Sequence, residues 1–331
     1  MTRFAGFGRA VPIHQLAPAA SLAALSQIWP HLRGADLEPV TRYTVQPVAE
    51  VFSSQPLGER MKVYQREAPR LARLAVEEAL ADADLRADQI DIVFSVSCTG
   101  YMVPALDVRL AAELGFRSDV IRVPLTELGC SGGGAAIAAA HRHLRLEPSQ
   151  RALVVCVELC SLTFQPQDSS VDNMTAAMVF GDGAAAAVLT GEGGGLEVVA
   201  TATRLIPNSE DLLGFDLRDD GFHPVLDRRL PRLIQAELAG ALAGFGEGHF
   251  DFFAVHAGGP RIFDAVERGL GLPPNSLLQS RESFSRFGNL SSASLLLVLA
   301  GLRHGPAGPG LALAFGPGVT VEMATLRRSP E

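Results

Sequence analysis

The stretch Val120 to His143, VIRVPLTELGCSGGGAAIAAAHRH, joins a short apolar run, a turn of small residues and a run of strong helix formers. We interpret it as a strand at Val120–Leu125, a sharp turn at Thr126–Gly134, and a helix at Ala135–Leu144. Cys130 lies at the tip of the turn and the head of the helix, where unpaired backbone N–H groups create a positive field equivalent to about half a charge. That field favours the nucleophilic thiolate over the thiol. The alternative is that Cys130 is a small buried core residue, as free cysteines often are.

The composition excludes several classes of protein. The chain has 331 residues, enough for a large core or two fused domains, and 47% of them are hydrophobic. Its formal net charge of −8 argues against a nucleic-acid partner. The Ala-rich segments are interrupted by Arg, His, Asp or Gly, so we expect no membrane insertion, and the N-terminal residues do not resemble a signal peptide. The cysteines predict free thiols and a cytoplasmic protein: they are Cys98, Cys130, Cys156 and Cys160.

The predicted elements occur twice in the same order. One buried strand ends at Cys98 and another at His256, and a turn then opens an apolar helix at Cys130 and, in the second half, at Asn289. Each half closes with two strands around a glycine turn, for which we expect antiparallel hairpins: Ala184–Leu189 with Leu196–Thr203, and Gly310–Ala314 with Val319–Leu326. We infer an internal duplication of an α/β unit. The predicted halves are residues 1–203 and 204–331.

The duplication gives these polar residues a common location. If the halves pack about a pseudo-twofold axis, the helices that begin near Cys130 and Asn289 are buried together, and their N-termini converge with the His256 loop. Such a set suits thioester chemistry, because the Cys130 thiolate can accept an acyl group. His256 Nε2 and the Asn289 N–H₂ both donate hydrogen bonds to a thioester carbonyl oxygen, which stabilises the enolate formed when a malonyl thioester loses CO₂. The enolate then attacks the acyl-cysteine, and backbone N–H groups, including that of Cys130, hold the oxyanion.

Five short motifs carry a family resemblance. In chain order they are Gly129-Cys130-Ser131-Gly132-Gly133, Phe180-Gly181-Asp182-Gly183-Ala184, Val255-His256-Ala257-Gly258-Gly259-Pro260, Phe287-Gly288-Asn289-Leu290-Ser291-Ser292 and Phe315-Gly316-Pro317-Gly318-Val319. With this order and spacing the chain resembles a type III polyketide synthase of the chalcone/stilbene synthase family, within the thiolase superfamily. The third motif departs from the family's His-Pro-Gly-Gly-Pro, since Ala257 stands in place of the proline.

The resemblance implies a fold, a reaction and a site. The fold is a thiolase-like α/β fold in which two duplicated halves pack as a five-layered αβαβα sandwich. Cys130 would accept the acyl group, and His256 with Asn289 would direct decarboxylation and condensation. Phe180 and Phe222 would be gatekeepers between a CoA tunnel and the cavity. The remaining positions line the cavity or tune its size: Cys98, Glu158, Cys160, Thr163, Gly214, Ser291 and, at the cyclisation pocket, Pro317.

The partners follow from the same resemblance. Acyl-CoA and malonyl-CoA would be substrates, with no permanently bound cofactor, and Val103 matches a side chain that reaches into the neighbouring subunit, which implies a homodimer. The basic residues that hold CoA phosphates in the plant enzymes have no clean match, and Arg33, Arg42 and Arg261 are the nearby candidates. A starter bound to an acyl carrier protein therefore stays open. Cys replaces Thr at two cavity positions, and residues 157–164 most resemble bacterial members that make alkylresorcinols or alkylpyrones.

Other interpretations stay open. A single-step 3-ketoacyl synthase of the fatty-acid initiating type would use the same Cys, His and Asn, and a catalytically silent acyl-binding subunit would use none of them. Phe180 and Phe222 are core aromatics unless the resemblance holds at those positions. Asp182, between two glycines, is either a turn residue or a buried hydrogen-bond anchor, and we favour a structural role. No group of His, Cys and Asp residues has the spacing of zinc ligands, so we expect no metal site.

Overall fold

The centre of the fold is a mixed sheet in the computed structural model, which describes residues 1–30, 39–246 and 248–329. In these residues the sheet has nine strands in the order β11-β12-β13-β8-β1-β7-β6-β4-β5. In chain order the strands are β1 (Thr2–Ala10), β4 (Ile92–Val96), β5 (Ile121–Leu125), β6 (Arg151–Leu159), β7 (Asp182–Thr190), β8 (Leu196–Leu205), β11 (Phe252–Val255), β12 (Gly308–Gly316) and β13 (Thr320–Arg328).

The sheet contains the duplication that the sequence predicted. In the first half β4 runs parallel to β6, β6 antiparallel to β7, and β7 antiparallel to β1. In the second half β11, β12, β13 and β8 repeat the same pairings in the same order. The two sets meet where β1 and β8 share two residue pairs, Thr2 with Val198 and Arg3 with Glu197. The described part of the second half has no counterpart of β5 in this sheet.

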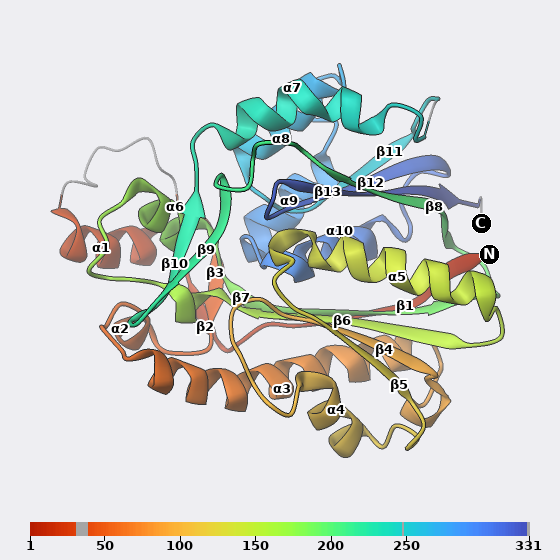
Figure 1. The fold of residues 1–331 in the computed structure, drawn as a ribbon, viewed down its shortest axis with the longest axis horizontal. Helices are drawn as coiled ribbons and strands as arrows, with labels where there is room; N and C mark the ends of the chain where they lie inside the picture. The colour runs from red at the N-terminus through yellow and green to blue at the C-terminus, as the bar shows by residue number, and fades with distance from the viewer. Residues whose placement is uncertain (31–38, 247, 330–331) are drawn as a thin grey trace.

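The helices complete five layers (Figure 1). One outer layer consists of α3 (Leu57–Asp82) and α4 (Leu106–Leu114), and the other of α7 (Leu230–Leu242) and α8 (Pro260–Gly269). The middle layer, between the two sets of strands, holds α5 (Gly132–Leu146) and α10 (Ser294–Leu302), with α9 (Leu278–Phe287) against α10. The predicted αβαβα sandwich of the thiolase-like fold is therefore confirmed.

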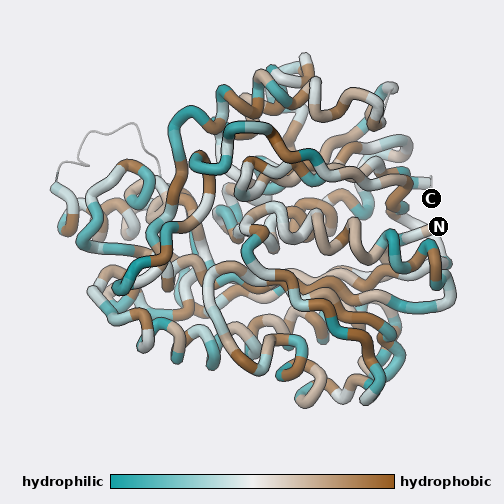
Figure 2. The backbone as a smooth tube through the Cα atoms, viewed as in Figure 1, coloured by the Kyte–Doolittle hydropathy of each residue, from teal (hydrophilic) through white to brown (hydrophobic). Residues whose placement is uncertain are grey.

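Burial explains why the middle helices form. Ser294 to Leu299 of α10 are all buried, because a helix between two sheets has no solvent-facing side. Brown, hydrophobic segments follow the strands and teal segments gather in outer turns (Figure 2), which places the core on both faces of the sheet. None of the helices in the described residues combines the length and hydropathy needed to cross a bilayer.

Smaller elements gather at one end of the sandwich, at the left of Figure 1. They are β2 (His14–Leu16) paired with β3 (Arg42–Thr44), β9 (Leu213–Arg218) paired with β10 (Gly221–Leu226), α1 (Pro18–Ile28), α2 (Val48–Val51) and α6 (Val171–Val179). Three short 3₁₀ helices enter the site: η3 (Gly129–Ser131), η4 (Cys160–Thr163) and η5 (Ser291–Ala293); a fourth, η2 (Ala87–Gln89), precedes β4.

One predicted pairing is wrong. We expected the strands at Ala184–Leu189 and Leu196–Thr203 to form a hairpin, but β1 lies between β7 and β8 in the sheet. The N-terminal strand β1 pairs with the edge of β7 that the predicted hairpin would have used. A glycine turn between two strands does not show that a distant strand will pair there instead. The second predicted hairpin, β12 with β13, is confirmed. The division into residues 1–203 and 204–331 stays a prediction; that boundary falls within β8, which pairs with strands of both halves.

Candidate active site

Cys130 lies on the 3₁₀ turn η3, directly before α5, as the opening stretch predicted. Gly129 has a φ of +53°, and a Cβ there would stand 2.7 Å from Pro317 Cδ, so the turn needs glycine at this position. The side chain of Cys130 is 8% exposed. This turn therefore presents a nearly buried thiol at the head of a helix in the middle layer.

A cavity of about 550 Å³ opens in front of Cys130. The structure brings together around it eight side chains or backbone positions that the sequence assigned to a cavity: Cys98, Cys160, Thr163, Phe180, Gly214, Phe222, Ser291 and Pro317. They come from both halves of the chain and from the small sheet of β9 and β10. The volume lies within the range of about 300–1,000 Å³ that is usual for sites enclosing a small molecule.

Ser291 links the two thiols of the cavity. Its hydroxyl oxygen lies 3.5 Å from Cys130 Sγ and 3.6 Å from Cys98 Sγ. Its backbone has a φ of +47°, which is uncommon for a residue with a side chain. The Ser291 N–H donates to Asn289 Oδ1 at 2.8 Å, which fixes this conformation. The turn that opens α10 thus places a hydroxyl group directly beside the Cys130 thiol.

Asn289 is oriented by the same turn. Its Oδ1 accepts from the Ser291 N–H and, at 3.4 Å, from the Ser294 hydroxyl. The amide N–H₂ is then the group that faces the sulfur, and its hydrogen bond lowers the pKa of Cys130. Backbone bonds to the segment before β7, Asn289 N–H to Val179 O at 2.8 Å and Gly181 N–H to Asn289 O at 3.0 Å, hold the residue in place.

His256 directly follows β11 and is buried. Among the described residues neither of its ring nitrogens has a hydrogen-bond partner, and burial lowers its pKa to about 4. Its ring lies edge-on to Phe315 with centroids 6.2 Å apart, at the end of β12 that contacts η3. A buried polar side chain without a partner is costly, which suggests that a substrate atom completes the site. Neither His256 nor Asn289 belongs to the cavity lining as described.

The ionisation of Cys130 differs from the prediction. We expected the helix head to favour the thiolate, but the pKa of Cys130 is raised to about 12. Burial is the main cause, and the negative charge of Glu158 adds to it, whereas the hydrogen bonds from Ser291, Asn289 and the Cys130 backbone lower the pKa. The desolvation of a buried thiolate outweighs a partial charge at a helix end. The resting residue is therefore a thiol.

Glu158 lies beneath the cavity and does not line it. The carboxylate is fully buried and accepts hydrogen bonds from Thr99 Oγ1 at 2.8 Å, from the Cys98 N–H at 3.1 Å and from the Ser292 hydroxyl. Burial raises its pKa, and these bonds lower it. Its place on β6 allows it to tie the loop after β4 to the turn before α10, which positions Cys98 and Ser291.

The two predicted gatekeepers both line the cavity. Phe180 follows α6 and precedes β7, and an isolated parallel bridge joins its backbone to Asn289. Phe222 lies on β10, packs edge-on against Phe215 with centroids 5.6 Å apart, and its carbonyl accepts from Gln165 Nε2 at 3.0 Å. Both rings line the cavity, and the gating role stays a prediction.

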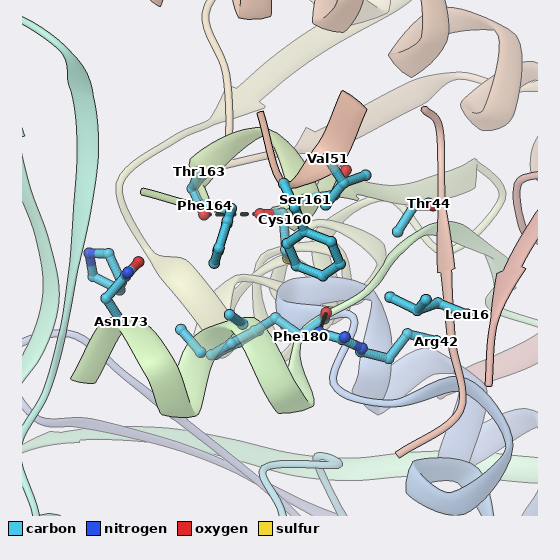
Figure 3. A pocket seen from close by; sticks show the side chains of 14 residues that line it. Leu16, Arg42, Thr44, Val51, Cys160, Ser161, Thr163, Phe164, Asn173 and Phe180 are labelled. Carbon is cyan, nitrogen blue, oxygen red and sulfur yellow. Dashed lines mark hydrogen bonds between the residues drawn. The ribbon is translucent and has the colours of Figure 1, made fainter. Parts of the chain in front are cut away.

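The candidate phosphate-binding arginines have different surroundings. Arg33 lies outside the described residues, and Arg261 is exposed near the start of α8. Arg42 is buried, and its guanidinium points toward Phe180 (Figure 3), where it donates to the Phe180 carbonyl at 3.4 Å and to the Ser21 hydroxyl. Burial lowers the pKa of Arg42 to about 10. These contacts favour a structural role for Arg42, and CoA binding by any of the three stays a prediction.

The sequence missed part of the cavity wall. Leu213, Phe215 and Leu217 of β9 line it together with Tyr101 and Glu210. These residues lie outside the five motifs, and β9 reaches the cavity only because the small sheet folds back over it, so no local pattern indicated them. Within the described residues no set of three His, Cys, Asp or Glu side chains is arranged to hold a metal ion.

Comparison with known proteins places this geometry in context. Residues 43–193 match the family model for the N-terminal domain of chalcone and stilbene synthases, and residues 197–330 match the model for the C-terminal domain. The 1,3,6,8-tetrahydroxynaphthalene synthase of Streptomyces coelicolor is 40% identical over 297 residues, 86% of this chain and 79% of that protein. The alpha-pyrone synthesis polyketide synthase-like protein Pks18 of Mycobacterium tuberculosis is 32% identical over 82% of this chain and 74% of its own length. The crystal structure of the Streptomyces coelicolor synthase, a bacterial type III polyketide synthase, gives a TM-score of 0.91 at 35% identity, covering 98% of this chain and 99% of that one.

Proposed function

This chain belongs to the chalcone and stilbene synthase family, and from that premise we propose that it loads an acyl-CoA starter on Cys130, extends it by repeated decarboxylative condensation with malonyl-CoA, and cyclises the product to a pyrone, a resorcinol or a related aromatic. The observation that carries the proposal is the cavity of about 550 Å³ directly in front of the Cys130 thiol. It supports a chain longer than one two-carbon unit staying on the enzyme between condensations.

The residues divide the reaction among them. His256 takes the proton of the Cys130 thiol, the sulfur attacks the starter thioester, and CoA leaves as its thiol. Malonyl-CoA then loses CO₂, and the Asn289 N–H₂ and the His256 N–H stabilise the enolate oxygen by hydrogen bonds. The enolate carbon attacks the acyl-cysteine, which releases the Cys130 thiolate and leaves the lengthened chain on CoA. Reloading that chain on Cys130 begins the next cycle.

Product analysis tests the proposal. The enzyme is incubated with malonyl-CoA alone and with acyl-CoA starters from acetyl-CoA to palmitoyl-CoA, and products are identified by liquid chromatography and mass spectrometry. Pyrones or phenolic rings built from at least two malonyl units are expected. The Cys130→Ala variant is the matched control and should give none of them. A single β-ketoacyl thioester as the only product would instead identify the one-step ketoacyl synthase, and product formation that survives Cys130→Ala would contradict covalent loading.

We also propose that the enzyme is a homodimer. Val103 is 76% exposed and Tyr101 69% exposed, although Tyr101 lines the reaction cavity. The strand β5 has β4 as its one neighbour in the described sheet, and Ile121 on it is exposed. Exposed apolar residues beside an open sheet edge support a second copy of the chain at this surface.

Two further assignments rest on single observations. All four cysteines are free thiols, which suits a reducing compartment, so we propose a cytoplasmic location. An acyl carrier protein as starter donor remains an alternative to CoA. Of the two candidate phosphate-binding arginines that the structure describes, Arg42 is buried and Arg261 is exposed. Replacing acyl-CoA by acyl-carrier protein in the product assay distinguishes the two donors.

A further inference from the structure

Asp182 is a buried carboxylate that the proposed reaction does not use. It is the first residue of β7, it is fully buried, and it stands between Gly181 and Gly183. Burial raises its pKa to about 6, whereas hydrogen bonds and the charge of Arg42 lower it. A buried carboxylate is costly unless it is well compensated, so its partners indicate what it does.

Three donors converge on this carboxylate. The Ser161 N–H donates to Oδ1 at 2.7 Å, the Ser161 hydroxyl donates to Oδ2 at 2.6 Å, and the Val45 N–H donates to Oδ2 at 2.8 Å. Ser161 belongs to η4 and Val45 follows β3, so one side chain joins the start of β7 to two segments far from it in sequence. Charge-assisted bonds of this kind are among the stronger hydrogen bonds in proteins.

The 3₁₀ helix η4 is a wall of the reaction cavity. Cys160 and Thr163, on either side of Ser161, line both that cavity and a smaller hollow behind it, and Phe180 lines both as well (Figure 3). The Thr163 hydroxyl donates to the Cys160 carbonyl at 2.8 Å, so η4 is held as one unit. It directly follows β6, and Ser161 bonds it to Asp182 at the start of the neighbouring strand β7.

The gatekeeper segment is tied to the same place. Arg42, which is attracted by the charge of Asp182, donates to the Phe180 carbonyl at 3.4 Å. A Cβ on Gly183 would stand 2.6 Å from Leu290 Cδ1, so the backbone beside Asp182 packs closely against Leu290. The wall of Cys160, Thr163 and Phe180 is therefore tied to the Asp182 carboxylate at its β7 side, whereas Arg60 holds the far end of η4 through the Leu162 and Phe164 carbonyls.

We propose that Asp182 is a positioning residue that fixes the Cys160–Thr163–Phe180 wall and thereby sets how many malonyl units are added before the chain leaves the cavity. The inference rests on the proposed function, since it concerns the length of the product. It assigns no contact between Asp182 and substrate: the carboxylate acts through Ser161 and Arg42. Acyl loading should depend on Asp182 much less, because Cys130 lies on η3 and makes no hydrogen bond to η4 or Asp182 in the described residues.

The test compares Asp182→Asn with Ser161→Ala. The amide offers one acceptor oxygen where the carboxylate offers two and turns an N–H₂ toward the remaining donors, so the wall loses at least one bond. Ser161→Ala removes the hydroxyl bond alone, keeps the carboxylate, and serves if Asp182→Asn does not fold. Asp91→Asn is the matched control: Asp91 accepts the Arg151 N–H at 2.7 Å, but precedes β4, at the end of that strand away from Cys98.

Each variant is incubated with malonyl-CoA and the starter that the wild-type enzyme extends best, and two quantities are measured. In Asp182→Asn the ratio of products with altered chain length to the wild-type product should rise by about fivefold or more, with a smaller rise in Ser161→Ala. Acyl-Cys130 formation, read by intact-protein mass, should stay near the wild-type level, as should both quantities in Asp91→Asn. An unchanged product ratio in both wall variants, or a loss of loading as large as the loss of product, would overturn the inference. Absence of any multiply extended product from the wild-type enzyme would overturn the proposed function, and this inference with it.

Discussion

The buried His256 makes the stability of this enzyme depend on pH in a specific way. Its pKa is lowered from 6.5 to about 4 by burial, with no hydrogen-bond partner among the described residues to offset that cost. At about 1.4 kcal/mol per pKa unit, this difference amounts to about 3 kcal/mol. The perturbation to test is His256→Gln, which keeps a polar side chain of similar size and removes the titration.

The sign follows from the two states of the protein. Between pH 6.5 and pH 4 the unfolded chain carries the proton on this residue and the folded chain does not, so acid stabilises the unfolded state. The contribution of His256 to the free energy of unfolding is present in full above about pH 6.5. It falls as the pH drops and stops falling once the pH is below about 4. The free energy of unfolding of the wild-type enzyme should therefore fall by about 3 kcal/mol more than that of His256→Gln between pH 7 and pH 4.

Urea unfolding at several pH values measures this difference. Protein concentration is held constant, since an oligomer's apparent stability depends on it. The carboxylates whose pKa burial raises, Glu158 and Asp182 among them, are common to both proteins and cancel in the comparison. His249→Gln is the control, because the His249 side chain is 86% exposed, and its replacement should change the pH dependence far less than His256→Gln does. Equal pH dependence in wild type and His256→Gln would refute the assignment of His256 as a buried neutral base.

Two predictions concern the remaining assignments. Cys130→Ala should abolish acyl-enzyme formation in intact-protein mass spectra yet keep some conversion of malonyl-CoA to acetyl-CoA. Asn289→Ala should lower that conversion by about 10²–10³-fold with less effect on acyl loading. Equal loss of loading in both variants would contradict this division of roles. Val103→Asp should shift the enzyme toward monomer in analytical ultracentrifugation, because a charge would replace an exposed apolar contact residue; a wild-type enzyme that is already monomeric at micromolar concentration would argue against the dimer.

The parts of the fold that the sequence predicted are those fixed by local pattern. The buried strand Ile92–Val96 is apolar at every position except Ser95, and Leu106–Leu114 has both helical periodicity and a glycine directly after it. The order of these elements was enough to reveal the duplication. The false hairpin of β7 and β8 shows the limit, because the partner of a strand is decided by the whole sheet and here is the distant N-terminal strand β1.

The candidate site divides in the same way. Motif residues such as Phe180 and Ser291 could be assigned to a cavity, because the motifs that contain them resemble those of a known family, and both line the cavity in the structure. Leu213 and Phe215 could not, since their place in the wall depends on how the sheet of β9 and β10 folds against η4. The ionisation of Cys130 was missed for a related reason: the helix head is visible in the sequence, but the desolvation that dominates the pKa is a property of the packed core.

The pKa values of Cys130 and His256 bear on how the nucleophile is made. Burial raises the pKa of the thiol to about 12 and lowers that of the imidazole to about 4, so each residue alone is neutral at physiological pH. In the proposed reaction a proton transfer from Cys130 to His256 would create two opposite charges together, and their mutual attraction in a medium of low polarity would offset part of the desolvation that disfavours either charge alone. A thiol is oxidised less readily than a thiolate. This matters here because Cys98 and Cys130 lie close together, each in contact with the Ser291 hydroxyl group.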